Sequence, residues 1–269
     1  MSKRAAPVFA VKTIDELAID DERSFRHVAL YADLKEILRR DRYTFRVLPA
    51  SLAGRWDRAL FLNLTFWGSG GGGDVLESDR IPADVVAHAA WHHLAARAFT
   101  SSPGTPQSAE ALFLGEAIAS AFDVYLAGRL LGHAPQSSFL ESQVPAMAEA
   151  ADAAGLSEAG FEAMLGTIAA DPDRAFEDLR ALLFDATCAL SACNGADEAL
   201  VALASFEEHR FASLLHRHEL SNWVLYARAY ANAAPGPDER ARAVDRALRE
   251  PGVVATDWLA TNWVTPAMA

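Results

Sequence analysis

Two histidines, His88 and His92, lie four residues apart in a segment that otherwise has the composition of a buried helix. An α-helix turns once every 3.6 residues, so side chains at positions i and i+4 lie above one another on the same face. Two imidazoles in that arrangement can bind a single ion. The spacing therefore predicts a pair of metal ligands on this helix.

A second run of polar residues occurs in the next apolar segment. Glu116, Ser120 and Asp123 are spaced as i, i+4 and i+7, so they share one helix face among residues that are mostly apolar. Burying an unpaired carboxylate costs roughly several kcal/mol. We therefore expect the two polar faces to pack against each other, which would bring Glu116 to His88 and His92.

Two neutral imidazoles and one carboxylate oxygen form a ligand set that suits zinc, with a fourth position left for water. Zinc is accordingly the cofactor that the sequence indicates, and its predicted ligands are His88, His92 and Glu116. Asp84 or Asp123 could accept a hydrogen bond from the second ring nitrogen of a ligating histidine. In the alternative, these groups form a metal-free hydrogen-bonded network that satisfies a polar core.

Hydrophobic periodicity predicts the elements that position these residues. Two helices, at 82–99 and 108–131, carry the two histidines and the glutamate. Strands are expected before them at 43–48, 59–67 and 74–78, the last at an edge. Further helices are expected near 14–20, 24–40, 157–169, 173–193, 196–216, 220–232 and 237–249. The fold class predicted is therefore mainly α with a small β-sheet (α+β).

The order of these elements resembles the gluzincin branch of the zincin metallopeptidases. The strand at 59–67, the glycine stretch 69–73, a short strand and the His-x-x-x-His helix are followed by a helix containing Leu114-Gly115-Glu116-Ala117. The resemblance covers roughly residues 42–132. It implies zinc ligation by His88, His92 and Glu116, with the glutamate 24 residues after His92.

Two residues depart from the family pattern. The general-base glutamate that follows the first histidine in the family is Ala89 here, and a methyl group cannot take a proton. The acidic residue usually found four positions after the ligand glutamate is Ser120. The resemblance thus implies the fold and the metal site more strongly than peptidase activity, and it identifies no catalytic residue.

The resemblance also suggests how the chain is divided. We expect a zincin-like N-terminal half followed by a C-terminal helical bundle. The divisions are an N-terminal helical segment at 1–41, a zincin-like α+β domain at 42–135 and a C-terminal helical domain at 136–269.

Histidines outside the motif have simpler interpretations. His93 lies about 100° round the helix from His92, so we expect it to point away from the site. His216 and His218 are two residues apart and belong to a predicted solvated, charged face. Trp223 and Tyr226 are expected to anchor helix packing.

Charge and composition exclude several classes of partner. The net charge of −12 repels phosphate backbones and anionic lipid, so neither nucleic acid nor a membrane is an expected partner. The sequence has no convincing secretory segment and no uncharged apolar run of about 18 residues. It contains only two cysteines, Cys188 and Cys193. We therefore expect a cytoplasmic protein.

Three functions are compatible with these patterns. The first is a zincin-like protein that retains a zinc site of two histidines and one glutamate without standard peptidase activity, and that serves binding, with a protein or peptide partner, or structure. The second is an active metallohydrolase whose general base is not at position 89. The third is a metal-free helical interaction or structural protein, in which the polar faces satisfy one another.

Overall fold

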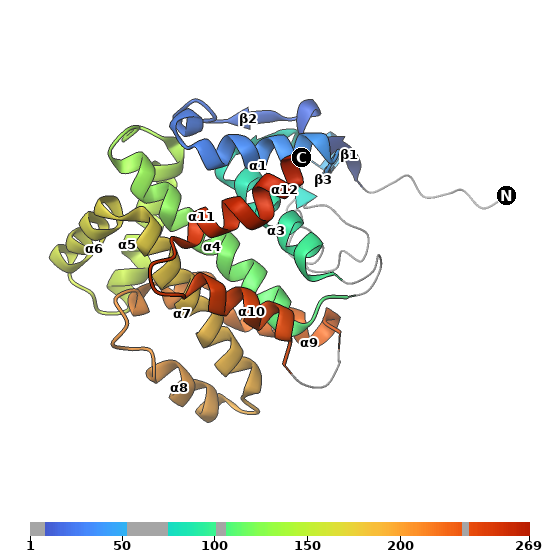
Figure 1. The fold of residues 1–269 in the computed structure, drawn as a ribbon. Helices are drawn as coiled ribbons and strands as arrows, with labels where there is room; N and C mark the ends of the chain where they lie inside the picture. Colours follow the sequence, from blue (N-terminus) through green and yellow to red (C-terminus); the bar gives the residue numbers. More distant parts are fainter. Residues whose placement is uncertain (1–8, 53–74, 101–105, 233–236) are drawn as a thin grey trace.

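A computed structural model describes residues 9–52, 75–100, 106–232 and 237–269. Within these ranges the protein is mainly α-helical, and its short strands lie at one end of the helices (Figure 1). This confirms the predicted fold class, mainly α with a small sheet. The predicted strand at 59–67 and the glycine stretch 69–73 lie outside the described residues.

The strands form two small sheets. One contains β1 (Ala10–Thr13), β3 (Thr44–Val47) and β4 (Val75–Leu76), in the order β1-β3-β4. β1 runs antiparallel to β3, and β3 runs parallel to β4. The second pairs β2 (Ala18–Asp20) with β5 (Arg80–Pro82) in parallel. The strand predicted at 43–48 is confirmed as β3. Among the described strands β4 lies at an edge, as expected for the segment 74–78.

The N-terminal region differs from the prediction of two helices. The second helix exists as α1 (Ala29–Arg40), preceded by a 3₁₀ turn at Ser24–His27. The first is replaced by a 3₁₀ turn at Ile14–Glu16 and by strand β2. Ile19 of β2 pairs with Ile81, which is fully buried. The spacing of Ile14 and Leu17 predicted a helix, and this prediction is wrong. The local structure is decided instead by pairing with strand β5, about 60 residues later in the chain.

The helices α3 (Ala83–Phe99) and α4 (Ala109–Leu131) match the two predicted helices to within one residue at each end. Pro82 precedes α3, and Asp84 lies in its first turn, where a carboxylate complements the helix dipole. Ser108 caps α4 by accepting a hydrogen bond from the Ala111 backbone N–H at 3.0 Å. Gly132 is the C-terminal cap of α4.

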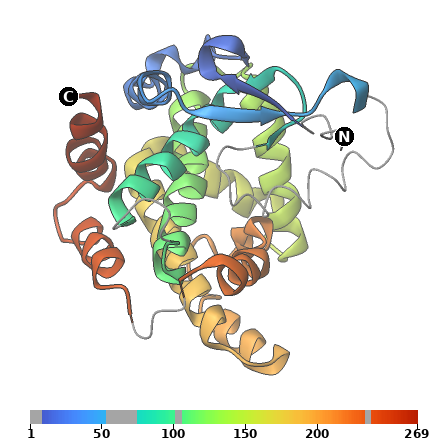
Figure 2. The same cartoon turned by 90° about the vertical axis from the view of Figure 1, so that its right-hand side faces the viewer.

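Most of the remaining helices pack around α4, whereas α8 packs against α7. They are α5 (Ser138–Ala153), α6 (Glu158–Ala170), α7 (Pro172–Ala192), α8 (Ala196–Ala204), the 3₁₀ helix η4 (Ala212–His218), α9 (Leu220–Tyr230), α10 (Glu239–Leu248), α11 (Ala255–Leu259) and α12 (Thr265–Met268). The segment predicted as one helix over 196–216 is thus two elements separated by turns. α4 packs most extensively against α7 and α3, and Figure 2 shows the C-terminal helices along one side of the bundle.

One hydrophobic core connects these elements. It extends from Ile14 through α3, α4 and α7 to Val264, so the three predicted divisions share buried side chains. The C-terminal tail docks onto this core: Leu259 is fully buried, and the Trp263 ring packs edge-on against Phe99.

Helix α4 is long and apolar enough to cross a lipid bilayer by length and composition. In this structure 83% of that apolar segment is buried among the other helices, and a central core helix of a globular fold has the same properties.

Candidate metal centre

The core fixes the orientation of α3 around its two histidines. Trp91, which directly precedes His92, is fully buried and packs edge-on against Phe122 of α4, with ring centroids 5.4 Å apart. Val86 and Ala90 are also fully buried. Because this face of α3 is held by the core, His88 and His92 project from a helix whose rotation is already set.

A close approach of the two helices brings Glu116 into reach. A methyl group placed on Gly115 of α4 would lie only 3.2 Å from Cβ of Ala95 on α3, tighter than ordinary contact. Glycine at this position therefore lets the helix backbones come together beside the next residue, Glu116. The result is that a carboxylate on α4 reaches a histidine one turn before Ala95 on α3.

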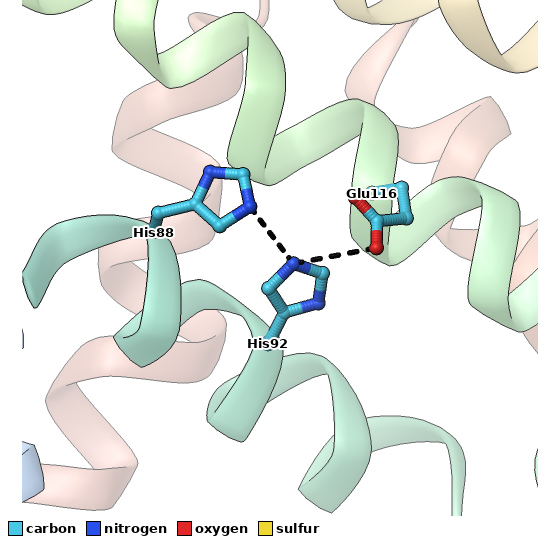
Figure 3. A group of neighbouring side chains, drawn as sticks. All are labelled: His88, His92 and Glu116. Carbon is cyan, nitrogen blue, oxygen red and sulfur yellow. Dashed lines mark hydrogen bonds and ion pairs between the residues drawn. The ribbon is translucent and has the colours of Figure 1, made fainter. Parts of the chain in front are cut away.

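The three predicted ligands converge. The Nε2 atoms of His88 and His92 are 3.1 Å apart, and Nε2 of His92 is 3.6 Å from Oε1 of Glu116. One ligand atom from each residue can be chosen so that all three lie within 4.8 Å of one another. Figure 3 shows both rings and the carboxylate pointing toward a common region from α3 and α4. This group could hold a metal ion.

Two of the three separations between the ligand atoms are close to those of tetrahedral coordination, and the third is within 4.8 Å. With metal–ligand bonds of about 2.0–2.2 Å, two ligand atoms of a regular tetrahedron are separated by about 3.3–3.6 Å. The measured 3.1 Å and 3.6 Å are close to that range. The side chains of His92 and Glu116 remain 30% and 21% exposed, so the group is partly accessible to solvent.

A small hollow lies beside two of these ligands. Its volume is about 30 Å³, and it is lined by His92, Ala95, Gln107, Leu112, Phe113, Gly115, Glu116, Trp223 and Tyr226. Trp223 is buried, as the helix-packing prediction requires. That it and Tyr226 would also border the candidate metal centre was missed, because α9 is about 100 residues from α4 in the chain.

Asp84 and Asp123 do not act as predicted. Among the described residues, neither carboxylate hydrogen-bonds to the ring of His88 or His92. Burial raises the pKa of Asp84. It raises the pKa of Asp123 well above its usual value, and the Asp84 charge adds to this effect while Arg217 opposes it. Both residues are partly buried, one on α3 and the other on α4.

His93 points away from the centre, as expected. Its Nε2 lies 2.6 Å from Oδ2 of Asp41, and its ring packs edge-on against Tyr43. Arg97 bonds to the same Asp41 carboxylate.

The interpretation of His218 as a solvated residue is wrong. Its Nε2 is buried and has no hydrogen-bond partner in the part of the chain that the structure describes. Burial, together with the smaller electrostatic effects of Arg217 and His88, lowers the pKa of His218 to about 3. The neighbouring His216 is exposed, as predicted. The two-residue spacing of these histidines does not predict this difference, because burial within η4 depends on tertiary packing, which includes contacts with α5.

The two departures from the peptidase pattern are both buried. Ala89 is only 1% exposed, and Ser120 is 7% exposed. Neither supplies a group able to take a proton from a metal-bound water.

Comparison with known proteins supplies no assignment: no family model, no curated protein and no solved structure matches this chain.

Proposed function

We propose that this chain is a metal-binding protein in which His88, His92 and Glu116 hold a zinc ion. The observation that carries the proposal is the convergence of three donor atoms. The Nε2 atom of His92 lies 3.1 Å from Nε2 of His88 and 3.6 Å from Oε1 of Glu116. Two imidazole nitrogens and one carboxylate oxygen are ligands typical of zinc. The likeness to zincins belongs to this proposal and rests on the sequence motif and its predicted elements.

The proposed protein lacks standard peptidase chemistry. A metallopeptidase of this pattern needs a carboxylate that takes a proton from the metal-bound water, and Ala89 is a buried methyl group instead. The metal would then serve structure or the binding of a small ligand, and a protein or peptide partner could contact the surrounding surface.

The test is elemental analysis of the chain purified without added metal. About one zinc per chain is expected, with loss of the metal in His88→Ala and in Glu116→Gln. His216→Ala is the matched control, because that imidazole is exposed and belongs to another face. Wild-type protein that binds no divalent metal, even after addition of zinc or cobalt, would contradict the proposal.

A metal-free structural role is the second candidate. It is favoured by the contacts among the three side chains, since the two rings are within hydrogen-bond distance and His92 can form an ion pair with Glu116. In that case a chelator leaves the melting temperature unchanged. A melting temperature that falls on chelation and recovers with zinc supports the metal-binding role.

A further inference from the structure

Helix α8 is apolar on every side, yet it buries none of its residues. Over residues 199–204 it consists only of alanine, leucine and valine. Val201 is 74% exposed and Leu200 is 66% exposed, more than any other large apolar side chain in the described part of the chain. A helix that is hydrophobic all round is usually enclosed by protein, and exposed apolar patches mark interaction sites. The composition of α8 therefore indicates a surface that a partner covers.

A groove of about 690 Å³ lies between α8 and the neighbouring helices. Leu200 and Leu203 of α8 line one side, and Leu190 of α7, Leu215 of η4 and Leu220 of α9 line the rest. Because these walls are helical, they offer no sheet edge to which an extended strand could add. A polypeptide that fills this α8 groove must satisfy its own backbone groups, as a helix does.

The charges at the α8 groove are negative. Glu207 and Glu219 line it, whereas none of its described lining residues is a lysine or an arginine. The first turn of α8 adds two more carboxylates. The arginines of the adjoining segments form bonds of their own, Arg210 with a carboxylate of α7, Arg217 with an amide of α5 and Arg228 with carbonyls near the end of α7. Charge complementarity therefore favours a partner that carries lysine or arginine.

A second copy of this chain suits the α8 groove less well. It would bring the same carboxylates to the interface, and like charges that face each other across an interface oppose association. The net charge of −12 adds a repulsion between whole molecules. The charges thus favour a basic partner over self-association.

We propose that the α8 groove binds a basic amphipathic helix of another protein. Apolar side chains spaced i, i+3, i+4 and i+7 on that helix contact Leu200, Leu203 and Leu215, while its lysines or arginines lie beside Glu207 and Glu219. Figures 1 and 2 show α8 at the end of the helical bundle opposite the strands. The inference uses none of the proposed metal ligands, so it does not depend on the metal-binding function.

A synthetic peptide tests the proposal by fluorescence anisotropy. The probe is a labelled helix of about 18 residues with leucines at i, i+3, i+4 and i+7 and lysines elsewhere, used at about pH 8, where exposed imidazoles are neutral. Saturable binding is expected. A peptide with glutamate in place of every lysine should bind at least about tenfold more weakly, because carboxylates then face carboxylates. A lysine–leucine peptide of the same composition without an apolar face should also bind at least about tenfold more weakly.

Variants of α8 test the apolar contact. Leu200→Gln should raise the dissociation constant of the basic peptide at least about tenfold and leave the melting temperature unchanged, because this side chain is exposed in the free protein. Leu225→Gln is the matched control, since Leu225 is 62% exposed on α9 and does not line the groove. Ala204→Arg places a large cation in the groove from an exposed position, and it provides the answer if Leu200→Gln does not fold.

A double variant tests the charge. Glu207→Gln combined with Glu219→Gln should weaken binding of the basic peptide at least about threefold at low salt, and the difference should shrink at about 0.5 M salt. Glu158→Gln combined with Glu162→Gln is the control, because both side chains are exposed on α6.

Each contrary result has its own meaning. Wild-type protein that does not bind the basic peptide, or tight binding retained in both Leu200→Gln and Ala204→Arg, overturns the groove as a docking site. Equal affinity for the acidic peptide, or no effect of the double glutamate variant, overturns the basic partner. A dimer in sedimentation equilibrium that Leu200→Gln dissociates assigns the groove to a second copy instead. Zinc content should be the same in all of these variants, so the proposed metal centre stands or fails separately.

Discussion

The Nε2 atoms of His88 and His92 lie 3.1 Å apart across one turn of α3. At this distance the two nitrogens can share one hydrogen, but two N–H groups cannot face each other there. A metal ion needs both nitrogens unprotonated, so protons and metal compete for the same pair.

Metal affinity should therefore fall on acidification. Between about pH 7.5 and about pH 5.5, where histidines commonly gain protons, the apparent affinity for zinc or cobalt is expected to drop at least about tenfold. Competition titration with a chromophoric chelator at several pH values measures this. An affinity that is constant over the range would show that His88 and His92 are not the ligands.

The buried ring of His218 should make the fold sensitive to acid. Its pKa in the folded chain is about 3, against 6.5 for an unperturbed histidine. Between these values the unfolded chain binds a proton that the folded chain does not, so this contribution to stability is fully present above about pH 6.5 and is lost as the pH falls toward 3. His218→Gln should show a shallower decline of melting temperature over this range than the wild type.

The exposed neighbour provides the control for that measurement. His216→Gln should retain the wild-type decline, because its side chain is solvated in the folded protein. If both variants follow the wild-type curve, His218 does not carry the acid sensitivity.

Replacing the ionisable side chain of Asp123 with a neutral amide should stabilise the protein at neutral pH. Burial and the Asp84 carboxylate raise the pKa of Asp123, so the folded chain binds a proton that the unfolded chain releases. At pH values above the usual pKa of aspartate, the stability of the fold therefore falls as the pH rises. The loss is about 1.4 kcal/mol for each unit by which the pKa of Asp123 is raised in the folded chain. Asp123→Asn should melt at a higher temperature at pH 7, and the gain should disappear near about pH 3. Asp152→Asn, an exposed position on α5, should have no such effect.

Gly128 marks a second close approach of α4, where its neighbours are α6 and α7. A methyl group there would lie 2.6 Å from the Ile168 carbonyl oxygen and 2.9 Å from Cγ of Pro172. Gly128→Ala is expected to destabilise the fold by about 1–3 kcal/mol, measured by denaturant unfolding. Gly132→Ala is the matched control, since nothing lies within 4 Å of the added methyl. Equal stability of the two variants would argue against the α4 packing described.

Restoring the peptidase glutamate should fail structurally. Ala89 is 1% exposed, so Ala89→Glu inserts a longer, charged side chain into the core and should lower stability by about 2–5 kcal/mol. Ala96→Glu, on an exposed face of the same helix, should be nearly neutral. A folded Ala89→Glu protein that hydrolyses peptides would instead support an active-site geometry like that of the zincins.

The candidate centre was predictable because its geometry is local. Helix periodicity alone places His88 above His92, and the cost of burying Glu116 unpaired turns its face toward them. Hydrophobic periodicity also placed α3 and α4 to within one residue at each end.

Other features depend on partners that are remote in the chain. Strand β2 forms because residues 18–20 pair with residues 80–82. The hydrophobic periodicity within residues 14–20 does not indicate this pairing. The burial of His218 likewise arises from packing between helices far apart in sequence. Patterns over a few turns cannot predict such contacts.

Because the core already fixes α3 and α4, the donor atoms of His88, His92 and Glu116 are in place before any ion arrives. An ion could then enter and leave without refolding of the chain, unlike in small domains that fold only around their metal. The fraction of protein carrying metal would follow the free concentration of the ion in its surroundings, as expected of a reversible reservoir or sensor.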